Sequence, residues 1–547
     1  MKINKILLGA FALSMTFASC SNDEPANGGD SNVTDGDRYM AVKIRTAGLG
    51  SSRTATVGSP NEFEEGTPQE SSIDAKDLRF LFFDEKGNAF PLAHGNIDGT
   101  VISNMVIPDE ITTEKGPGEI KEIVGTLVLG NGAGSYKGEV PSQVLVVANG
   151  DPTRISALEN KNLTAVLGTP SLAPLAWGAT SKFLMTSSVY YDAEKKLVKA
   201  VEIPKSKVAT TATAAENDPL VIHIERVAAK VRASYNDSYN VLNRNDATNN
   251  EFQFYDYDPT KKDLVGSKVK FIAEIVGWQL LNKASQANAF KELPKTYQEA
   301  EELLGENNAT NWVWNDDTRF RSYWAISNAG TKFQDDYNNY DLTTTAAEKY
   351  GSYTKNALDC AYCYENTGFY NDANIKENTR GTFATAIAIK AKIKKVGDTE
   401  PTTIFRYADN YYSKNAIEHL IKTRYVALHP EAEGYESQFV IDYVDNKAED
   451  NTFTPTVTYK GSTESITQYS TILKWDNGVT SYYLNVMHLN NKPGVVRNHI
   501  YDYKFDAIYG LGVPGSEPGT PVLTESYVAA RVYILNWHVV SNNVTLE

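Results

Sequence analysis

The sequence has little cysteine, no excess of basic residues and, beyond its N-terminus, no long apolar run. Only three of its 547 residues are cysteines, which excludes a fold held together by a dense disulfide framework. No later apolar run approaches the roughly 18 residues that a membrane-spanning helix needs. The formal net charge of −15 argues against nucleic acid as a partner, because phosphate binding needs a concentrated basic face.

The motifs of common enzyme classes are also missing. The chain has no G-x-S-x-G, H-E-x-x-H or P-loop pattern. Gly130 to Gly134 follows a strand pattern, but Ser135 stands where a dinucleotide-binding loop needs glycine, so a hairpin turn explains these glycines better. A glycosidase uses a pair of carboxylates, and Asp316 and Asp317 could be considered for that role. They are adjacent in the sequence, however, which is typical of a solvated turn. Because these catalytic motifs are missing, we expect no enzyme and no cofactor. The seven histidines are scattered along the chain, so we expect no metal site.

Short apolar runs bounded by turn residues recur along the chain. The run 78–83 ends at Asp84-Glu85-Lys86-Gly87-Asn88, and the run 143–148 ends at Asn149-Gly150. Aromatics make up 11% of the chain and there are 37 glycines, which suits strands and turns and predicts a mainly β protein of sandwich type. Apolar residues at three-to-four spacing predict short helices at 153–167, 295–304 and 414–422.

The first twenty residues have the pattern of a lipoprotein signal peptide. Lys2 and Lys5 form a basic start, residues 6–17 are apolar, and Cys20 follows two small residues. We expect export and lipidation of Cys20; a signal peptide without lipidation is the alternative. Residues 21–38 are polar and rich in Gly and Asp, which predicts a flexible tether.

The other two cysteines, Cys360 and Cys363, form a C-x-x-C motif. A structural zinc ion would need two further ligands. A redox-active pair would need a βαβ setting, which a mainly β chain does not offer. We expect either a local disulfide or two half-buried thiols.

A strand pattern near the N-terminus is followed by a loop that a protease could cut. Met40, Val42 and Ile44 alternate with more polar residues, and small residues then lead to Arg53. A trypsin-like cut between Arg53 and Thr54 would detach the strand. It would leave a groove with unpaired edges and an apolar floor.

The C-terminal segment has the pattern of a strand mounted on a hinge. After the Gly- and Pro-rich stretch 510–521, strict alternation puts Tyr533, Leu535, Trp537 and Val539 on one face. Folded back, this segment would be an ordinary edge strand. Released, it could complete the sheet of another molecule by β-augmentation.

Taken in order along the chain, these features resemble the fimbrillins of Bacteroidetes, and among them the shaft subunits of the short (minor) fimbriae. The likeness extends over the whole length. It is carried by the signal peptide, the strand before Gly50-Ser51-Ser52-Arg53, and the stretches 183–186, 221–231, 380–383, 389–392, 482–501 and 532–539.

The resemblance implies two tandem transthyretin-like Greek-key β-sandwich domains, a few short helices and an extended C-terminal donor strand. The implied donor residues are Val532, Tyr533, Ile534, Leu535, Trp537 and Val539. Together with the polar connections at 59–72, 210–218 and 510–521, it implies this division: signal peptide 1–19, tether and removable strand 20–53, N-terminal domain 54–218, C-terminal domain 219–521 and donor strand 522–547.

The resemblance also implies how the molecule is exported, processed and assembled. It would reach the outer membrane as a lipoprotein, lose its N-terminal strand to an arginine-specific protease, and polymerise by donor-strand exchange into a surface fimbrium. Arg53 occupies the matching cleavage position, and Arg45, inside the strand, ranks second. The implied partners are copies of the chain itself, anchor and tip subunits, the protease and an adhesion receptor.

A surface lipoprotein that binds glycans without polymerising is the alternative. Trp312, Trp314 and Trp324 could stack on sugar rings, or they could fill the core. A glycan receptor needs neither a cuttable loop at Arg53 nor a hinged tail, so the sequence favours the filament subunit.

Overall fold

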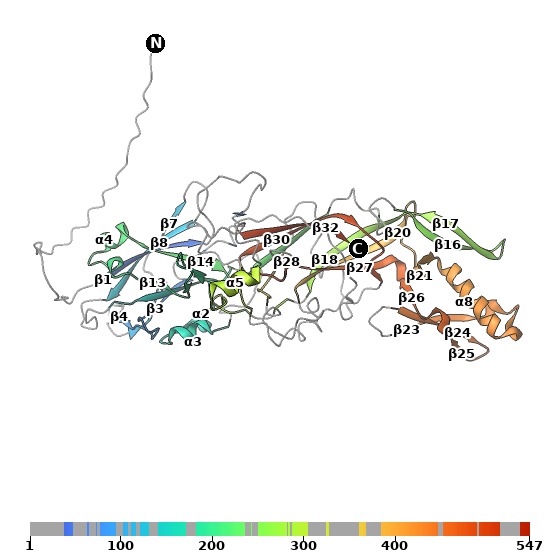
Figure 1. Ribbon diagram of the computed structural model, residues 1–547, viewed down its shortest axis with the longest axis horizontal. Helices are drawn as coiled ribbons and strands as arrows, with labels where there is room; N and C mark the ends of the chain where they lie inside the picture. The colour runs from blue at the N-terminus through green and yellow to red at the C-terminus, as the bar shows by residue number, and fades with distance from the viewer. Residues whose placement is uncertain are drawn as a thin grey trace, which may run out of the picture.

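The protein folds into β-sheets accompanied by a few short helices, arranged along one long axis (Figure 1). This confirms the expectation of a mainly β protein; the tandem transthyretin-like domains stay a prediction. The computed structural model describes residues 38–46, 63–64, 70, 73, 77–93, 102–107, 111–115, 121–130, 140–170, 182–235, 242, 250–281, 283–284, 287–304, 324–327, 360–367, 384–446, 452–488, 492–514 and 537–546.

A nine-stranded sheet lies at one end of the molecule, on the left in Figure 1. Its order is β6-β3-β9-β10-β14-β1-β8-β7, and β13 pairs with β9. The strands are β1 (Arg38–Thr46), β3 (Leu78–Phe83), β6 (Met105–Val106), β7 (Ile111–Lys115), β8 (Lys121–Gly130), β9 (Gln143–Ala148), β10 (Met185–Ser187), β13 (Val201–Glu202) and β14 (Leu220–Arg226).

Strands β3 and β9 have the bounds that the sequence predicts, because their apolar runs are buried on both faces. Phe80 and Phe82 of β3 pack into one core, which also contains residues of β1, β9 and β14. Leu81 and Phe83 pack into a second core on the other face, against residues of the short helices α2 (Pro152–Ser156) and α3 (Leu163–Leu167).

The predicted helix at 153–167 is therefore two helices. Asn160 has a left-handed φ of 57°, which a continuous helix does not allow. The Asn162 side chain then accepts a hydrogen bond from the Ala165 backbone nitrogen and begins α3.

The other two predicted helices are present. Helix α5 (Tyr297–Leu304) begins with a capping box, in which Thr296 and Glu299 bond each other's backbone nitrogens through their side chains. Helix α8 (Lys414–Leu428) starts where the pattern predicts, at the cap Ser413, but it runs six residues beyond the predicted end at 422.

Two further sheets pack face to face over a shared core. Val231 and Tyr503 enter this core from the five-stranded sheet, and Ile389 and Tyr482 enter it from the four-stranded sheet. The five-stranded sheet, in the order β19-β15-β30-β32-β2, contains β2 (Phe63–Glu64), β15 (Ala229–Tyr235), β19 (Cys360–Cys363), β30 (His499–Ile508) and β32 (Trp537–Leu546). The four-stranded sheet, in the order β18-β20-β27-β31, contains β18 (Phe271–Leu281), β20 (Ala386–Lys395), β27 (Val479–Asn485) and β31 (Val513–Pro514).

An eight-stranded sheet with helix α8 lies at the opposite end, on the right in Figure 1. Ile417 and Ile421 of α8 share a core with Phe405 and Val457 of this sheet. Its order is β17-β16-β22-β21-β26-β24-β23, with β25 on β24. The strands are β16 (Phe252–Asp258), β17 (Asp263–Val269), β21 (Ile404–Tyr407), β22 (Asn410–Tyr412), β23 (Val440–Asp445), β24 (Thr452–Tyr459), β25 (Ser462–Ser465) and β26 (Ile472–Trp475).

The chain passes from the nine-stranded to the five-stranded sheet at Val227 and Ala228, between β14 and β15. The polar connection expected at 210–218 contains helix α4 (Ala212–Asn217), whose cap is Thr211. The domain boundary at 218 stays a prediction.

Short elements complete the described part of the chain. No helix there is long and apolar enough to cross a membrane. Three two-stranded pairs are β4 (Leu92–Ala93) with β5 (Ile102–Ser103), β11 (Tyr190–Tyr191) with β12 (Leu197–Val198), and β28 (Met487–His488) with β29 (Lys492–Pro493); the 3-10 turns are η2 (Lys205–Lys207), η7 (Pro430–Ala432), η8 (Glu436–Gln438), η9 (Thr467–Tyr469) and η10 (Asp476–Gly478).

Candidate functional site

The strand expected to be removable, β1, is an interior strand of the nine-stranded sheet. It pairs in parallel with β14, from Val42 opposite Leu220 to Thr46 opposite Ile224. On its other side it pairs antiparallel with β8. We call the space between β14 and β8 the β1 slot. Without β1, both of these neighbours would have a row of unpaired backbone groups.

The β1 slot has an apolar floor. Met40, Ala41 and Val42 are fully buried, and Met40 and Val42 share a core with Leu127 and Ile222. Ile44 lies opposite Ile222 of β14 and Ile123 of β8 in the register. The alternation seen in the sequence therefore corresponds to a real buried face at Met40 and Val42.

The C-terminal strand β32 lies in its own molecule's five-stranded sheet. It pairs in parallel with β30, from His499 opposite His538 to Ile508 opposite Leu546. Trp537 lies opposite Glu64 of β2, and Val539 lies opposite Ile500 of β30. Residues 537–546 are therefore folded back onto their own molecule, but β32 lies between β30 and β2 and is not the edge strand expected for that state.

The two strands have the same kind of neighbours. Strand β1 has parallel β14 on one side and antiparallel β8 on the other. Strand β32 has parallel β30 on one side and antiparallel β2 on the other. The backbone of each strand therefore meets one ladder of each type.

Strand β2 is the last strand of the five-stranded sheet and pairs with β32 over two residues only. Phe63 lies opposite His538, and Glu64 lies opposite Trp537. Because β2 comes ten residues after Arg53 in the sequence, the chain just beyond the expected cut contacts the C-terminal strand.

Glu70, six residues after β2, is a buried anchor for this part of the chain. Its side chain is 1% exposed, and its carboxylate lies 3.0 Å from the ammonium of Lys230 on β15. The same carboxylate accepts a hydrogen bond from the hydroxyl of Tyr362 on β19. The backbone oxygen of Glu70 accepts a 2.5 Å hydrogen bond from Nε of Arg226.

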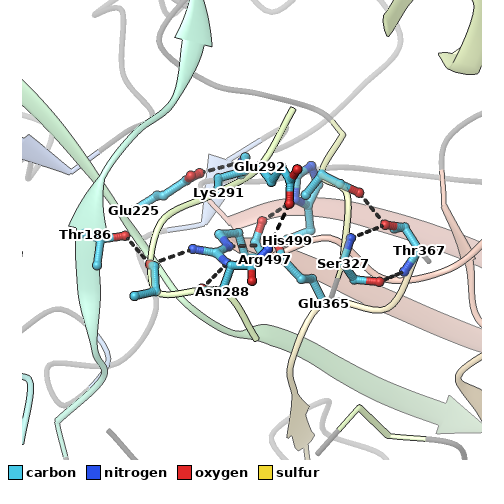
Figure 2. Close-up of polar contacts among 12 residues, drawn as sticks. Thr186, Glu225, Asn288, Lys291, Glu292, Ser327, Glu365, Thr367, Arg497 and His499 are labelled. Carbon is cyan, nitrogen blue, oxygen red and sulfur yellow. Dashed lines mark hydrogen bonds and ion pairs between the residues drawn. The ribbon is translucent and has the colours of Figure 1, made fainter. Parts of the chain in front are cut away.

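Buried ion pairs lie where the nine-stranded and five-stranded sheets meet (Figure 2). Lys291 lies 2.7 Å from Glu225 of β14. Arg497, two residues before β30, forms a two-pronged contact with Glu365, with Nε 2.8 Å from one carboxylate oxygen. None of these four side chains is more than 1% exposed. We call this group the junction cluster.

Two backbone oxygens accept further hydrogen bonds from Arg497. Its guanidinium donates to the carbonyls of Asn288 at 2.6 Å and Ala289 at 3.1 Å. The Ala289 carbonyl also accepts a hydrogen bond from Thr186 of β10 at 2.9 Å. The junction cluster thus connects β10 and β14 to the start of β30.

Burial governs the protonation of the first pair in this cluster. It raises the pKa of Glu225 and lowers the pKa of Lys291, because both charged forms lose their hydration, while their mutual attraction opposes both shifts. For Arg497, burial acts to lower the pKa, but the Glu365 carboxylate outweighs it and the pKa is raised. Arg497 is therefore charged at every relevant pH.

The C-x-x-C cysteines lie on β19 as thiols that form no disulfide in the described residues, with Cys360 half-buried and Cys363 buried. Residues three apart on an extended strand point to opposite faces and are separated by roughly 10 Å, which exceeds the span of a disulfide. The local disulfide is therefore incompatible with this strand. Burial raises the pKa of Cys363 to about 12, so its thiol stays protonated and unreactive.

Of the remaining candidate residues, the structure describes Trp324 and leaves the others outside the described part of the chain. Trp324 is 2% exposed and belongs to the core, so it offers no surface for a sugar. In the part of the chain that the structure covers, no three His, Cys, Asp or Glu residues are grouped as metal ligands. The others lie outside the described residues: Cys20, Arg53, Thr54, Trp312, Trp314, Asp316, Asp317, Val532, Tyr533, Ile534 and Leu535.

Comparisons with known proteins give likenesses to solved structures alone. No family model matches the chain, and no curated protein matches it. Several solved structures match, and three of them illustrate the likeness. A proposed cell adhesion protein from Parabacteroides distasonis ATCC 8503 is 13% identical and has a TM-score of 0.31, over 93% of this chain and 99% of that one.

The other two structures give similar values. A proposed cell adhesion protein from Bacteroides eggerthii DSM 20697 is 12% identical, with a TM-score of 0.29 over 68% of this chain and 80% of that one. The tip fimbrial protein Mfa3 from Porphyromonas gingivalis, with a C-terminal truncation, is 12% identical, with a TM-score of 0.28 over 66% and 80%. Values this low do not assign a family to the chain.

Proposed function

We propose that this protein is the shaft subunit of a bacterial fimbrium, exported as a lipoprotein, cut after Arg53 and polymerised by donor-strand exchange. One observation carries the proposal. The strand that precedes Arg53 in the sequence is an interior strand with a buried apolar face, so its loss would leave a slot that needs another strand.

The free energy available in the β1 slot is large. Each fully buried apolar side chain contributes about 1.5–3 kcal/mol, and each ladder hydrogen bond contributes about 1 kcal/mol. Five residues of β14 and eight of β8 face β1 in the register. A chain cut after Arg53 would therefore gain several kcal/mol of free energy by binding a new strand in the β1 slot. Without such a strand, the open slot would favour aggregation.

The C-terminal strand is suited to be that strand. In its own sheet β32 already has one parallel and one antiparallel neighbour, which is the arrangement that the β1 slot requires. The stretch from Tyr533 to Val539 would supply the alternating apolar face.

Such a contact makes an open filament. Donor strand and slot are different surfaces of one chain, so the interface is heterologous and need not close. The partners would be further copies, an anchor subunit, a tip subunit and an arginine-specific protease. The precursor would reside at the outer membrane and the product in a surface fimbrium, where adhesion to a receptor would be a property of the filament.

The N-terminal residue of the protein in filaments sheared from cells tests this proposal. We expect mass spectrometry to find Thr54 first in high-molecular-weight ladders. Arg53→Gln should remove the ladders and leave a lipidated monomer, whereas the matched control Arg45→Gln should assemble normally. Loss of ladders with Arg45→Gln alone would move the cut to Arg45.

A lipidated Cys20 on a wild-type monomer, with no ladder, would contradict the proposal. A surface lipoprotein that binds glycans would then be the better interpretation. Trp324 could not be its sugar platform, because that ring is buried in the core.

A further inference from the structure

We propose that β2, held in place by Glu70, is a latch that keeps the C-terminal strand in its own sheet until the chain is cut after Arg53. This inference rests on the proposed function, and it adds a step between cleavage and assembly. The carrying observation is the pairing of β2 with β32 at the end of the five-stranded sheet.

Strand β2 determines whether β32 is an interior or an edge strand. With β2 present, β32 lies between β30 and β2. Without β2, β32 is held by β30 on one side only and can peel away from the sheet edge. The two-residue pairing is short, which makes it a contact that can open.

Glu70 is the positioning residue of the latch. Its buried carboxylate contacts Lys230 of β15 and Tyr362 of β19, the two strands on the far side of β30 from β32. Its backbone oxygen accepts from Arg226. Glu70 thereby ties the chain beyond β2 to the sheet that contains the C-terminal strand.

In the uncut chain β2 is held from both directions. It is joined to Glu70 on one side and, through a segment that includes Arg53, to β1 on the other; β1 ends at Thr46 inside the nine-stranded sheet. A cut after Arg53 removes the second connection. After the cut β2 is tethered at one end only, so it gains more conformational entropy by leaving β32 than it would gain while tethered at both ends.

Engineered disulfides test the latch directly. In a Cys360→Ala/Cys363→Ala background, we would join β2 to β32 with Phe63→Cys and His538→Cys, which are opposite in the register. His538 is not one of the residues of the alternating apolar face, so the reduced variant keeps the proposed donor residues. The matched control is Asp256→Cys with Val265→Cys, which are opposite in the β16–β17 hairpin.

We expect the oxidised β2–β32 variant to be cut at Arg53 and to stay monomeric. Reduction should restore ladders, and the hairpin control should assemble in both states. A fully oxidised β2–β32 variant that assembles as fast as its reduced form overturns the latch. If the reduced parent fails to assemble as well, it is the proposed function that fails.

Hydrogen exchange of the monomer gives a second, independent test. Glu70→Gln should speed exchange of residues 537–546 about tenfold or more, because a buried charged contact is lost. Exchange in β9 should not change. Lys207→Gln, which removes a partly exposed ion pair with Asp218, should leave residues 537–546 as in the wild type. Equal exchange in all three proteins overturns the role of Glu70.

Discussion

Arg497 is one of the largest fully buried side chains among the described residues, although it carries a charge. A buried guanidinium is tolerated when its donors are satisfied. Two oxygens of Glu365 and two backbone carbonyls accept from it. Its removal would leave the Glu365 carboxylate buried without its main partner.

The first prediction at the residue scale concerns this pair. Arg497→Leu should lower the free energy of unfolding by about 3–5 kcal/mol, because breaking a buried ion pair leaves an uncompensated charge. The control Arg406→Leu removes an exposed pair with Asp409 and should cost roughly 0–1 kcal/mol. Urea unfolding of both variants measures the difference, and equal losses would contradict the assigned role of the junction cluster.

Neither Arg497 nor Glu70 could be singled out from the sequence. Glu365 is 132 positions from Arg497, and Tyr362 is 292 positions from Glu70. Local patterns carry no information about such distant partners. The alternation at Met40 and Val42 was readable because it depends only on neighbours along one strand.

At the scale of elements, a tight turn connects β26 to β27 and is closed by Gly478. This glycine has a φ of +68°, and a Cβ there would lie 2.1 Å from the backbone oxygen of Ile393 in β20. The turn therefore brings two stretches of backbone together at a distance that only glycine allows.

Alanine substitutions at two glycines with positive φ test this close approach. Gly461→Ala, in the β24–β25 turn, meets nothing within 4 Å and should cost roughly 1–2 kcal/mol from its positive φ alone. Gly478→Ala should cost clearly more, because its Cβ also collides with the β20 backbone. Thermal and urea unfolding of the two variants decide the matter; similar losses would mean that the turn shifts to accept the methyl group.

Elements with a strong local sequence pattern were predicted with the right bounds. Which elements lie beside them in the sheets was not predicted. The runs at 78–83 and 143–148 are strands with the expected bounds, because a continuous apolar run suits a strand buried on both faces. The 153–167 helix failed because a left-handed Asn160 divides it. That β1 lies between β14 and β8 depends on pairings over long sequence separations, which periodicity does not encode.

At the scale of the whole molecule, the proposed acceptor and donor are distinct parts of one chain. A chain lacking residues 532–547 should accept a strand but donate none. Mixed with the full-length protein, it should shorten filaments as its fraction rises, because each copy would end growth at one end. Filament lengths measured by electron microscopy check this. Long ladders from the truncated chain alone would refute strand donation through the tail.

The sequence was enough to predict a mainly β fold. It did not predict which strands belong to which sheet. Composition and turn spacing were enough to expect a mainly β protein. The boundary expected at 218 rests on a polar stretch and stays a prediction. The passage from the nine-stranded to the five-stranded sheet occurs at Val227 and Ala228, within an apolar run. Composition identifies where a chain is polar, and sheet membership is decided by which strands pair.

The position of the junction cluster has a mechanical consequence. The β1 slot lies in the nine-stranded sheet, and the C-terminal strand emerges from the five-stranded sheet. Arg497, Glu365, Lys291 and Glu225 lie where these sheets meet. In the fimbrium that we propose, tension applied through one neighbour and resisted by the next would cross each subunit at this point. The buried ion pairs would then hold the two sheets together at their junction while the strands of the subunit are pulled in shear.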